Sequence, residues 1–200
     1  IDTERLQVDW ELDATTMTGR GEIGDQTFHV GLSPFMGVMG VAPVEAGTHA
    51  TPPPRYCGGN IDCKELVRGS SLFLPISVEG ALFSIGDGHA IQGDGESSGT
   101  AIECPMDVVD ITLRVREDME LTMPRANTPA GWITFGFHED LNEAAAVALD
   151  EMVVLIQQFY GIKKVEATAL ASVAVDLRIT QVVNGVKGVH AVLPHGAIRK

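Results

Sequence analysis

Apolar and polar residues alternate along much of the chain, which predicts a protein built mainly of short β-strands. Alternation at residues 6–10 and 27–30 predicts strands within the N-terminal region. Two further runs, residues 72–78 and 81–85, predict strands that lead directly into a glycine-rich segment. Between these regions proline and glycine recur so often that residues 33–63 are expected to be mostly loop.

Helical periodicity appears only in the second half of the chain. Asp140 and Glu143 match a capping box, and apolar residues then recur at helical spacing as far as Gly161, which favours a left-handed stop. Residues 164–171 predict a second, shorter helix. The apolar stripe of the first helix is expected to lie on a sheet or on another helix.

Further strands are predicted on both sides of these helices. The predicted segments are residues 108–115, 120–123, 131–137 and 176–183. The pair Asn184-Gly185 follows the last of them and is a strong turn signal. Strands first, then a helical pair and a final strand indicate an α+β fold dominated by β structure.

Composition narrows the classes of partner. The 200 residues are 44% hydrophobic, enough for one core of ordinary size. Fourteen basic against 27 acidic side chains give a formal charge of −13, which disfavours nucleic acid and anionic membrane surfaces as partners. No apolar run approaches the roughly 18 to 20 residues of a membrane span, so we expect a cytoplasmic protein.

The glycine-rich segment 86–96 carries the strongest chemical signal. Four of its side chains bind metals or transfer protons: Asp87, His89, Asp94 and Glu96. Asn60, Asp62 and Glu103 stand nearby in the sequence. One imidazole with carboxylates is a common way to hold zinc while leaving a position for water, so the segment indicates a hydrolytic metal site. The alternative is a hydrogen-bonded or calcium-like turn, because Asp-Gly pairs are also ordinary turn formers.

Cysteine and serine residues suggest two other sites. Cys57 and Cys63 flank a short polar segment, so a thiolate metal site is conceivable, but their spacing matches no zinc ribbon. Cys104 or the pair Ser97-Ser98 offers a nucleophile, yet neither has a partner lysine at a recognisable spacing. Ordinary loop residues explain these side chains equally well.

Three blocks of sequence resemble the acetamidase/formamidase family in consecutive order. They are residues 34–43 (Pro-Phe-Met-Gly-Val-Met-Gly-Val-Ala-Pro), 58–62 (Gly-Gly-Asn-Ile-Asp) and 80–96, which contains Gly-Asp-Gly-His-Ala-Ile-Gln-Gly-Asp-Gly-Glu. Residues 170–183 resemble that family's late helix-to-strand segment. The likeness predicts one acetamidase/formamidase-like domain over residues 1–200, without the further N-terminal β region that family members normally carry.

The resemblance implies hydrolysis of a short aliphatic amide, formamide or acetamide, to ammonia and the carboxylate. It also implies a β-sandwich or barrel-like core that assembles into oligomers. Because the chain starts abruptly at Ile1, we expect either a second copy or a fragment bearing the N-terminal strands to cover the exposed sheet. The rival functions are a non-catalytic β-rich metal- or ligand-binding module and a structural subunit.

A divalent metal is the cofactor that the residues favour. Asp87 and His89 are the first choice as ligands, with Asp62 as a weaker third. Zinc suits the imidazole best, and calcium is the alternative.

The remaining roles concern catalysis and substrate. Glu96 is predicted to be the general base, with Asp94 as the second catalytic carboxylate. Asn60 is predicted to orient the small amide.

Overall fold

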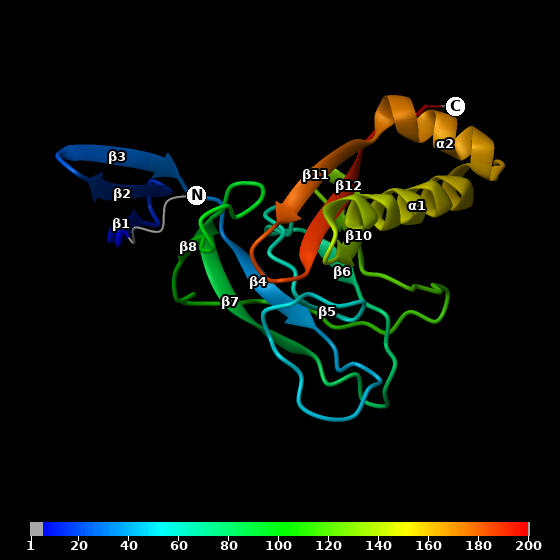
Figure 1. Cartoon of the computed structure of the whole chain (residues 1–200), viewed down its shortest axis with the longest axis horizontal. Helices are drawn as coiled ribbons and strands as arrows, with labels where there is room; N and C mark the ends of the chain where they lie inside the picture. The colour runs from blue at the N-terminus through cyan, green and yellow to red at the C-terminus, as the bar shows by residue number, and fades with distance from the viewer. Residues whose placement is uncertain (1–5, 200) are drawn as a thin grey trace.

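A computed structural model describes residues 6–199 as three antiparallel sheets and two helices (Figure 1). The first sheet contains β1 (Trp10–Asp13), β2 (Thr18–Ile23) and β3 (Gln26–Gly31), and it projects from one end of the molecule (Figure 1). The second has the order β5-β4-β7-β8, with β4 (Phe35–Gly40), β5 (Gly58–Asn60), β7 (Ser84–Ile91) and β8 (Ile102–Glu103). The third has the order β11-β12-β10-β9-β6, with β6 (Ser71–Phe73), β9 (Arg125–Thr128), β10 (Gly131–His138), β11 (Asp176–Gln181) and β12 (Lys187–Pro194). The predicted β-dominated α+β class is confirmed.

The two predicted helices are present, and the first has the predicted ends. Helix α1 (Leu141–Tyr160) begins after Asp140, whose carboxylate accepts hydrogen bonds from two backbone amides of the first turn. It ends at Gly161, which adopts the left-handed conformation with φ 64°. Helix α2 (Lys164–Ala174) extends three residues beyond its predicted end. Within residues 6–199 no single helix is long and apolar enough to cross a membrane; α1 and α2 together have the length and composition, but they are bent by 109° at their junction.

Strand β10 separates two hydrophobic clusters because its side chains alternate between the faces of the five-stranded sheet. On one face, Thr134 donates a hydrogen bond to the Ala148 carbonyl of α1, and the two helices pack over this face. On the other face, Ile133 and Phe135 are fully buried against the chain around residues 61–66. The sheet is therefore covered on one side by helices and on the other by the segment that follows β5.

The structure corrects the loop predicted for residues 33–63. Strands β4 and β5 lie within this range and pair with each other from Val38 to Gly40. Gly40 and Gly59 approach so closely that a side chain at position 40 would strike the backbone of Gly59. Glycine therefore serves close strand pairing here, whereas the sequence pattern predicts a loop.

The glycine-rich segment is also more regular than predicted. Strand β7 runs from Ser84 through His89 to Ile91 and pairs with β4. Gly88 lies against the Cys104 carbonyl of the chain beside it, where a side chain would not fit. The strand predicted for residues 81–85 begins only at Ser84, because Ala81 and Leu82 have positive φ angles. The preceding prediction, 72–78, shortens to Ser71–Phe73, and the prediction for residues 6–10 reaches a strand only at Trp10.

Strands predicted at residues 108–115 and 120–123 are not formed. The pattern is suited to a strand, yet no strand pairs with these segments in the part of the chain that the structure describes. Leu113 and Val115 are 66% and 77% exposed. Extended chain becomes a strand only when its backbone groups find a neighbour, so alternation alone does not decide the outcome.

Gly136 tests the packing of the sheet on α1. A Cβ at this position would collide with the backbone of Ala144 and Ala148. We expect Gly136→Ala to lower the free energy of unfolding by about 1–3 kcal/mol or more, because the helix backbone at Ala144 and Ala148 cannot move aside without disturbing α1. Gly31→Ala is the control, since a Cβ there meets nothing within 4 Å and φ is not positive. Urea unfolding of the two variants checks this; equal stabilities would contradict the packing.

Candidate metal centre

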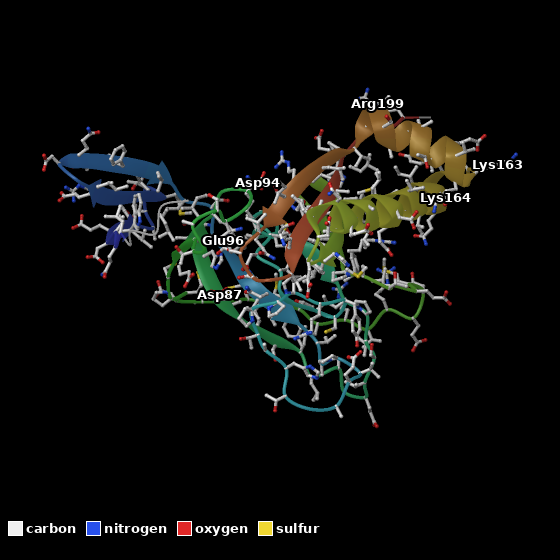
Figure 2. All side chains as sticks on the ribbon, in the orientation of Figure 1. Asp87, Asp94, Glu96, Lys163, Lys164 and Arg199 are labelled. Atoms are coloured by element: carbon white, nitrogen blue, oxygen red, sulfur yellow. The ribbon has the colours of Figure 1, made fainter. Side chains whose placement is uncertain are left out.

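The fold brings together four of the predicted site residues from separate segments. Asp62 follows β5, Asp87 and His89 lie on β7, and Glu96 lies on the loop after β7. Figure 2 labels Asp87 and Glu96. One ligand atom each from Asp62, His89 and Glu96 lie within 4.8 Å of one another, and all three side chains are buried. Asp87 and His89 form an overlapping group with Glu103 of β8, which is more exposed.

Gln92 orients the imidazole of His89. Its Nε2 donates to the Asp62 carbonyl at 2.7 Å and lies 3.4 Å from the Thr180 carbonyl. The amide oxygen of Gln92 therefore faces His89 Nδ1, at 2.9 Å, and accepts its proton. Nε2 is left to face the centre of the cluster, which is the arrangement that metal-binding histidines adopt.

The centre has an excess of negative charge. His89 Nε2 lies 3.2 Å from Asp87 Oδ2 and 3.9 Å from Asp62 Oδ1, and neither Nε2 nor Oδ1 has a hydrogen-bond partner. Burial, reinforced by the neighbouring Glu96 carboxylate, raises the pKa of Asp62 to about 7. Burial also raises the pKa of Glu96. A cation among these groups would relieve both the repulsion and the unsatisfied atoms.

Gly37 of β4 leaves the space that such a cation needs. A Cβ at this position would lie 2.6 Å from Asp62 Oδ1, 2.7 Å from Asp87 Oδ2 and 3.1 Å from His89 Nε2. The Gly37 carbonyl also accepts the backbone amides of Ile61 and Asp62, which holds the chain after β5 against β4. The donor set, the unsatisfied buried atoms and this space all fit a divalent ion.

Backbone strain is concentrated at the same residues. Asp62, Asp87 and Glu96 have φ angles of 53°, 60° and 45°, in the left-handed region that non-glycine residues avoid. Each costs about 1 kcal/mol relative to ordinary backbone. Strain that recurs at three clustered carboxylates is typical of functional sites.

Asn184 is a site residue that the sequence analysis did not assign. Its Nδ2 donates to Asp62 Oδ2 at 2.8 Å from the hairpin loop between β11 and β12. The Asn184-Gly185 signal identified the turn correctly, but it contains nothing that links residue 184 to residue 62. Such a contact, 122 residues apart in the chain, comes only from the fold.

Two of the predicted site residues have other surroundings. Asp94 forms an ion pair with Lys64 at 3.0 Å and lies 4.0 Å from Arg178, so its carboxylate is engaged outside the four-residue cluster. Asn60 lies on β5 opposite Val38, one residue from Gly37 along β4. It is therefore next to the centre, without being one of its charged groups.

A profile of the Acetamidase/Formamidase family matches residues 36–197, which contain every residue of the centre. The chain belongs to this family. It is 59% identical over 46 residues to an acetamidase of Mycolicibacterium smegmatis, a match that covers 23% of this chain and 11% of that protein. It is 50% identical over 46 residues to a formamidase of Methylophilus methylotrophus, covering 23% and 11%.

Solved family structures share the fold. An acetamidase from Bacillus halodurans superposes with a TM-score of 0.76 at 29% identity, covering 88% of this chain and 61% of that one. An acetamidase from Yersinia enterocolitica gives a TM-score of 0.80 at 23% identity, covering 96% and 56%. The chain thus spans about three fifths of the length of these family structures.

The thiolate metal site considered for Cys57 and Cys63 is not formed by these two residues. Cys57 and Cys63 are both free and buried. Cys63 belongs to a group of side chains that could bind a metal, with Glu65 and His190, and Cys57 is not part of it. Burial raises the pKa of the Cys104 thiol, which disfavours the thiolate that a nucleophile requires.

Substitution at Gly37 tests the space at the centre. Because the new Cβ would occupy the position between the three ligand atoms, we expect Gly37→Ala to weaken Zn²⁺ binding at least tenfold. Gly86→Ala, on the neighbouring strand β7, is the matched control, since a Cβ there meets nothing within 4 Å. Titration calorimetry with Zn²⁺ compares the two. Equal affinities in both variants would place the ion elsewhere.

Proposed function

We propose that this chain carries the catalytic centre of a metal-dependent amidohydrolase that cleaves formamide or acetamide to ammonia and the carboxylate. The observation that supports this most is the buried group of Asp62, His89 and Glu96, together with the space that Gly37 leaves in front of Asp62 and His89. Membership of the Acetamidase/Formamidase family supports amide hydrolysis as the reaction. The metal, its identity and the roles of the residues are our proposals.

In this proposal His89 and Asp62 hold the ion, with Asp87 at the more exposed side. Zinc fits an imidazole with carboxylates better than calcium, which prefers oxygen ligands alone. An ion held by these residues would supply Lewis-acid chemistry: it would polarise the amide carbonyl and lower the pKa of a nearby water, which a poor electrophile needs. Gln92 keeps His89 in the tautomer that directs Nε2 toward the ion.

Glu96 is the proposed general base. Its pKa is raised by burial, so the carboxylate takes a proton from water more readily than an exposed glutamate does. It then returns the proton to the departing ammonia. Asn60, at the edge of the centre, is the proposed residue that orients the amide.

Amide turnover by a Glu96 variant tests the function. We expect the wild-type protein to release ammonia from formamide or acetamide and to stop when a chelator removes the metal. Glu96→Gln keeps the size of the side chain but loses the proton acceptor, so turnover should fall roughly a hundredfold or more with metal content unchanged. Glu79→Gln, at an exposed position, is the control.

The outcomes separate the rival roles. If Glu96→Gln loses the metal as well, Glu96 is a ligand and the base is another residue. If turnover falls instead in Asp94→Asn, that carboxylate is the base. A wild-type protein that binds metal without amide turnover, alone or with a partner, would favour the non-catalytic binding module.

We also propose that another polypeptide covers residues 107–117, either a second copy of this chain or a fragment with additional strands. Val109, Ile111, Leu113 and Val115 alternate with polar residues and are all exposed, which is the pattern of a strand that lacks its neighbour. Added strand pairing there would bury them and satisfy their backbone groups.

Light scattering tests this association. We expect a species larger than the 21.3 kDa monomer, converted to monomer by Leu113→Asp. Val173→Asp is the control, because Val173 is 82% exposed but lies on α2. A wild-type protein that stays monomeric at micromolar concentration, with no partner fragment detectable by mass spectrometry, would refute the proposal.

A further inference from the structure

A second group of side chains that could bind a metal lies next to the candidate metal centre, because Cys63 directly follows Asp62 in the chain. Cys63 and Glu65 come from the segment after β5, and His190 comes from β12. The Sγ atom, a carboxylate oxygen and an imidazole nitrogen of these residues lie within 4.8 Å of one another, and all three residues are buried. The cluster lies on the face of the five-stranded sheet opposite the helices, beside Phe135.

We propose that Cys63, Glu65 and His190 bind a second divalent ion of the zinc class, in a buried structural site. Thiolate, carboxylate and imidazole are the three kinds of ligand that zinc takes in proteins, and a borderline-soft ion is the one that such a mixed set selects. This site lies outside the residues assigned to amide hydrolysis.

The separations of the ligand atoms are close to those of a filled coordination shell. The Cys63 thiol donates a hydrogen bond to Glu65 Oε2 at 3.4 Å, and His190 Nε2 lies 3.1 Å from the same oxygen. Ligands bound tetrahedrally at the usual zinc distances stand about 3.3 to 3.5 Å apart. Two of the three separations are thus close to those between zinc ligands, and all three ligand atoms lie within 4.8 Å of one another.

His190 has a buried nitrogen that the protein leaves unsatisfied. The ring is fully buried, and Nδ1 is engaged by the hydroxyl of Thr180 at 2.7 Å. Nε2 lies 3.1 Å from Glu65 Oε2, an ion-pair contact if the ring is protonated, and it has no hydrogen-bond partner. A buried polar atom without a partner needs an explanation, and an ion aligned with the nitrogen lone pair supplies one.

The neighbouring charges allow a cation. Arg178 donates to Glu65 Oε1 at 2.7 Å, so it engages the carboxylate oxygen that faces away from Cys63 and His190. Burial raises the pKa of the Cys63 thiol well above its ordinary value, so the thiolate would form only as the ion binds and displaces the proton; the thiolate and the Glu65 carboxylate would then balance the two charges of the ion. Arg178 has its own counter-charge in Asp94, whose Oδ2 lies 4.0 Å away.

The position of the site suggests what the ion does for the fold. Cys63 directly follows Asp62, and Gln92 contacts the carbonyls of both Asp62 and Thr180. An ion on Cys63 and His190 would therefore tie the strained segment that presents Asp62 to strand β12. Cys63 is fully buried, so the cluster gives no access to a substrate and has no nucleophilic role.

Cobalt substitution tests the site directly. Zn²⁺ is removed, Co²⁺ is added, and the absorption spectrum is recorded. We expect two metal equivalents per chain and a thiolate-to-cobalt charge-transfer band, since only the second site contains sulfur. This measurement needs no variant and is independent of amide turnover.

Three variants separate the two sites. Cys63→Ser should remove the charge-transfer band and one equivalent, and Cys57→Ser, at another buried free cysteine, should change neither. His89→Ala should remove one equivalent and keep the band, so failure of the first site is distinguishable from failure of the second. Wild-type protein with no thiolate band at saturating Co²⁺ would overturn the proposal, leaving Cys63, Glu65 and His190 as a metal-free hydrogen-bonded cluster.

Discussion

Buried negative charge is the constraint on which the site depends. Asp62, Asp87 and Glu96 converge on His89 without an arginine or lysine among them. Burial, reinforced by the neighbouring Glu96 carboxylate, raises the pKa of Asp62 to about 7. Two carboxylates, Asp62 and Glu96, are buried together, which favours a cation beside them, and the space facing Gly37 is where it fits.

Both larger sheets contribute to holding these groups. The four-stranded sheet supplies Asp87, His89 and the space at Gly37, whereas the hairpin of the five-stranded sheet supplies Asn184. The backbone of Gly95 bonds to Thr180 and Val182, which joins the loop of Glu96 to the end of β11. The centre therefore exists only when the two sheets are docked, and the strained backbone at its carboxylates is maintained by that docking.

The sequence predicted those features whose signals lie close together in the chain. Helix α1 was predictable to within a residue because its cap at Asp140 and its stop at Gly161 are encoded next to it. The clustering of Asp87, His89 and Glu96 was predictable because they are close in the chain. The roles of Gln92, Asn184 and Gly37 were not, since each depends on a partner from another segment. The strand predicted at residues 108–115 is not formed for the same reason, because a strand needs a neighbouring strand that the sequence pattern cannot specify.

Anomalous X-ray diffraction at the zinc absorption edge tests the central claim most directly. The account predicts a peak between Asp62 Oδ1 and His89 Nε2, on the side facing Gly37, with bonds of about 2.0–2.2 Å to both atoms. A zinc-saturated crystal with no peak at this position, and with Asp62 and His89 arranged as they are here, would contradict it.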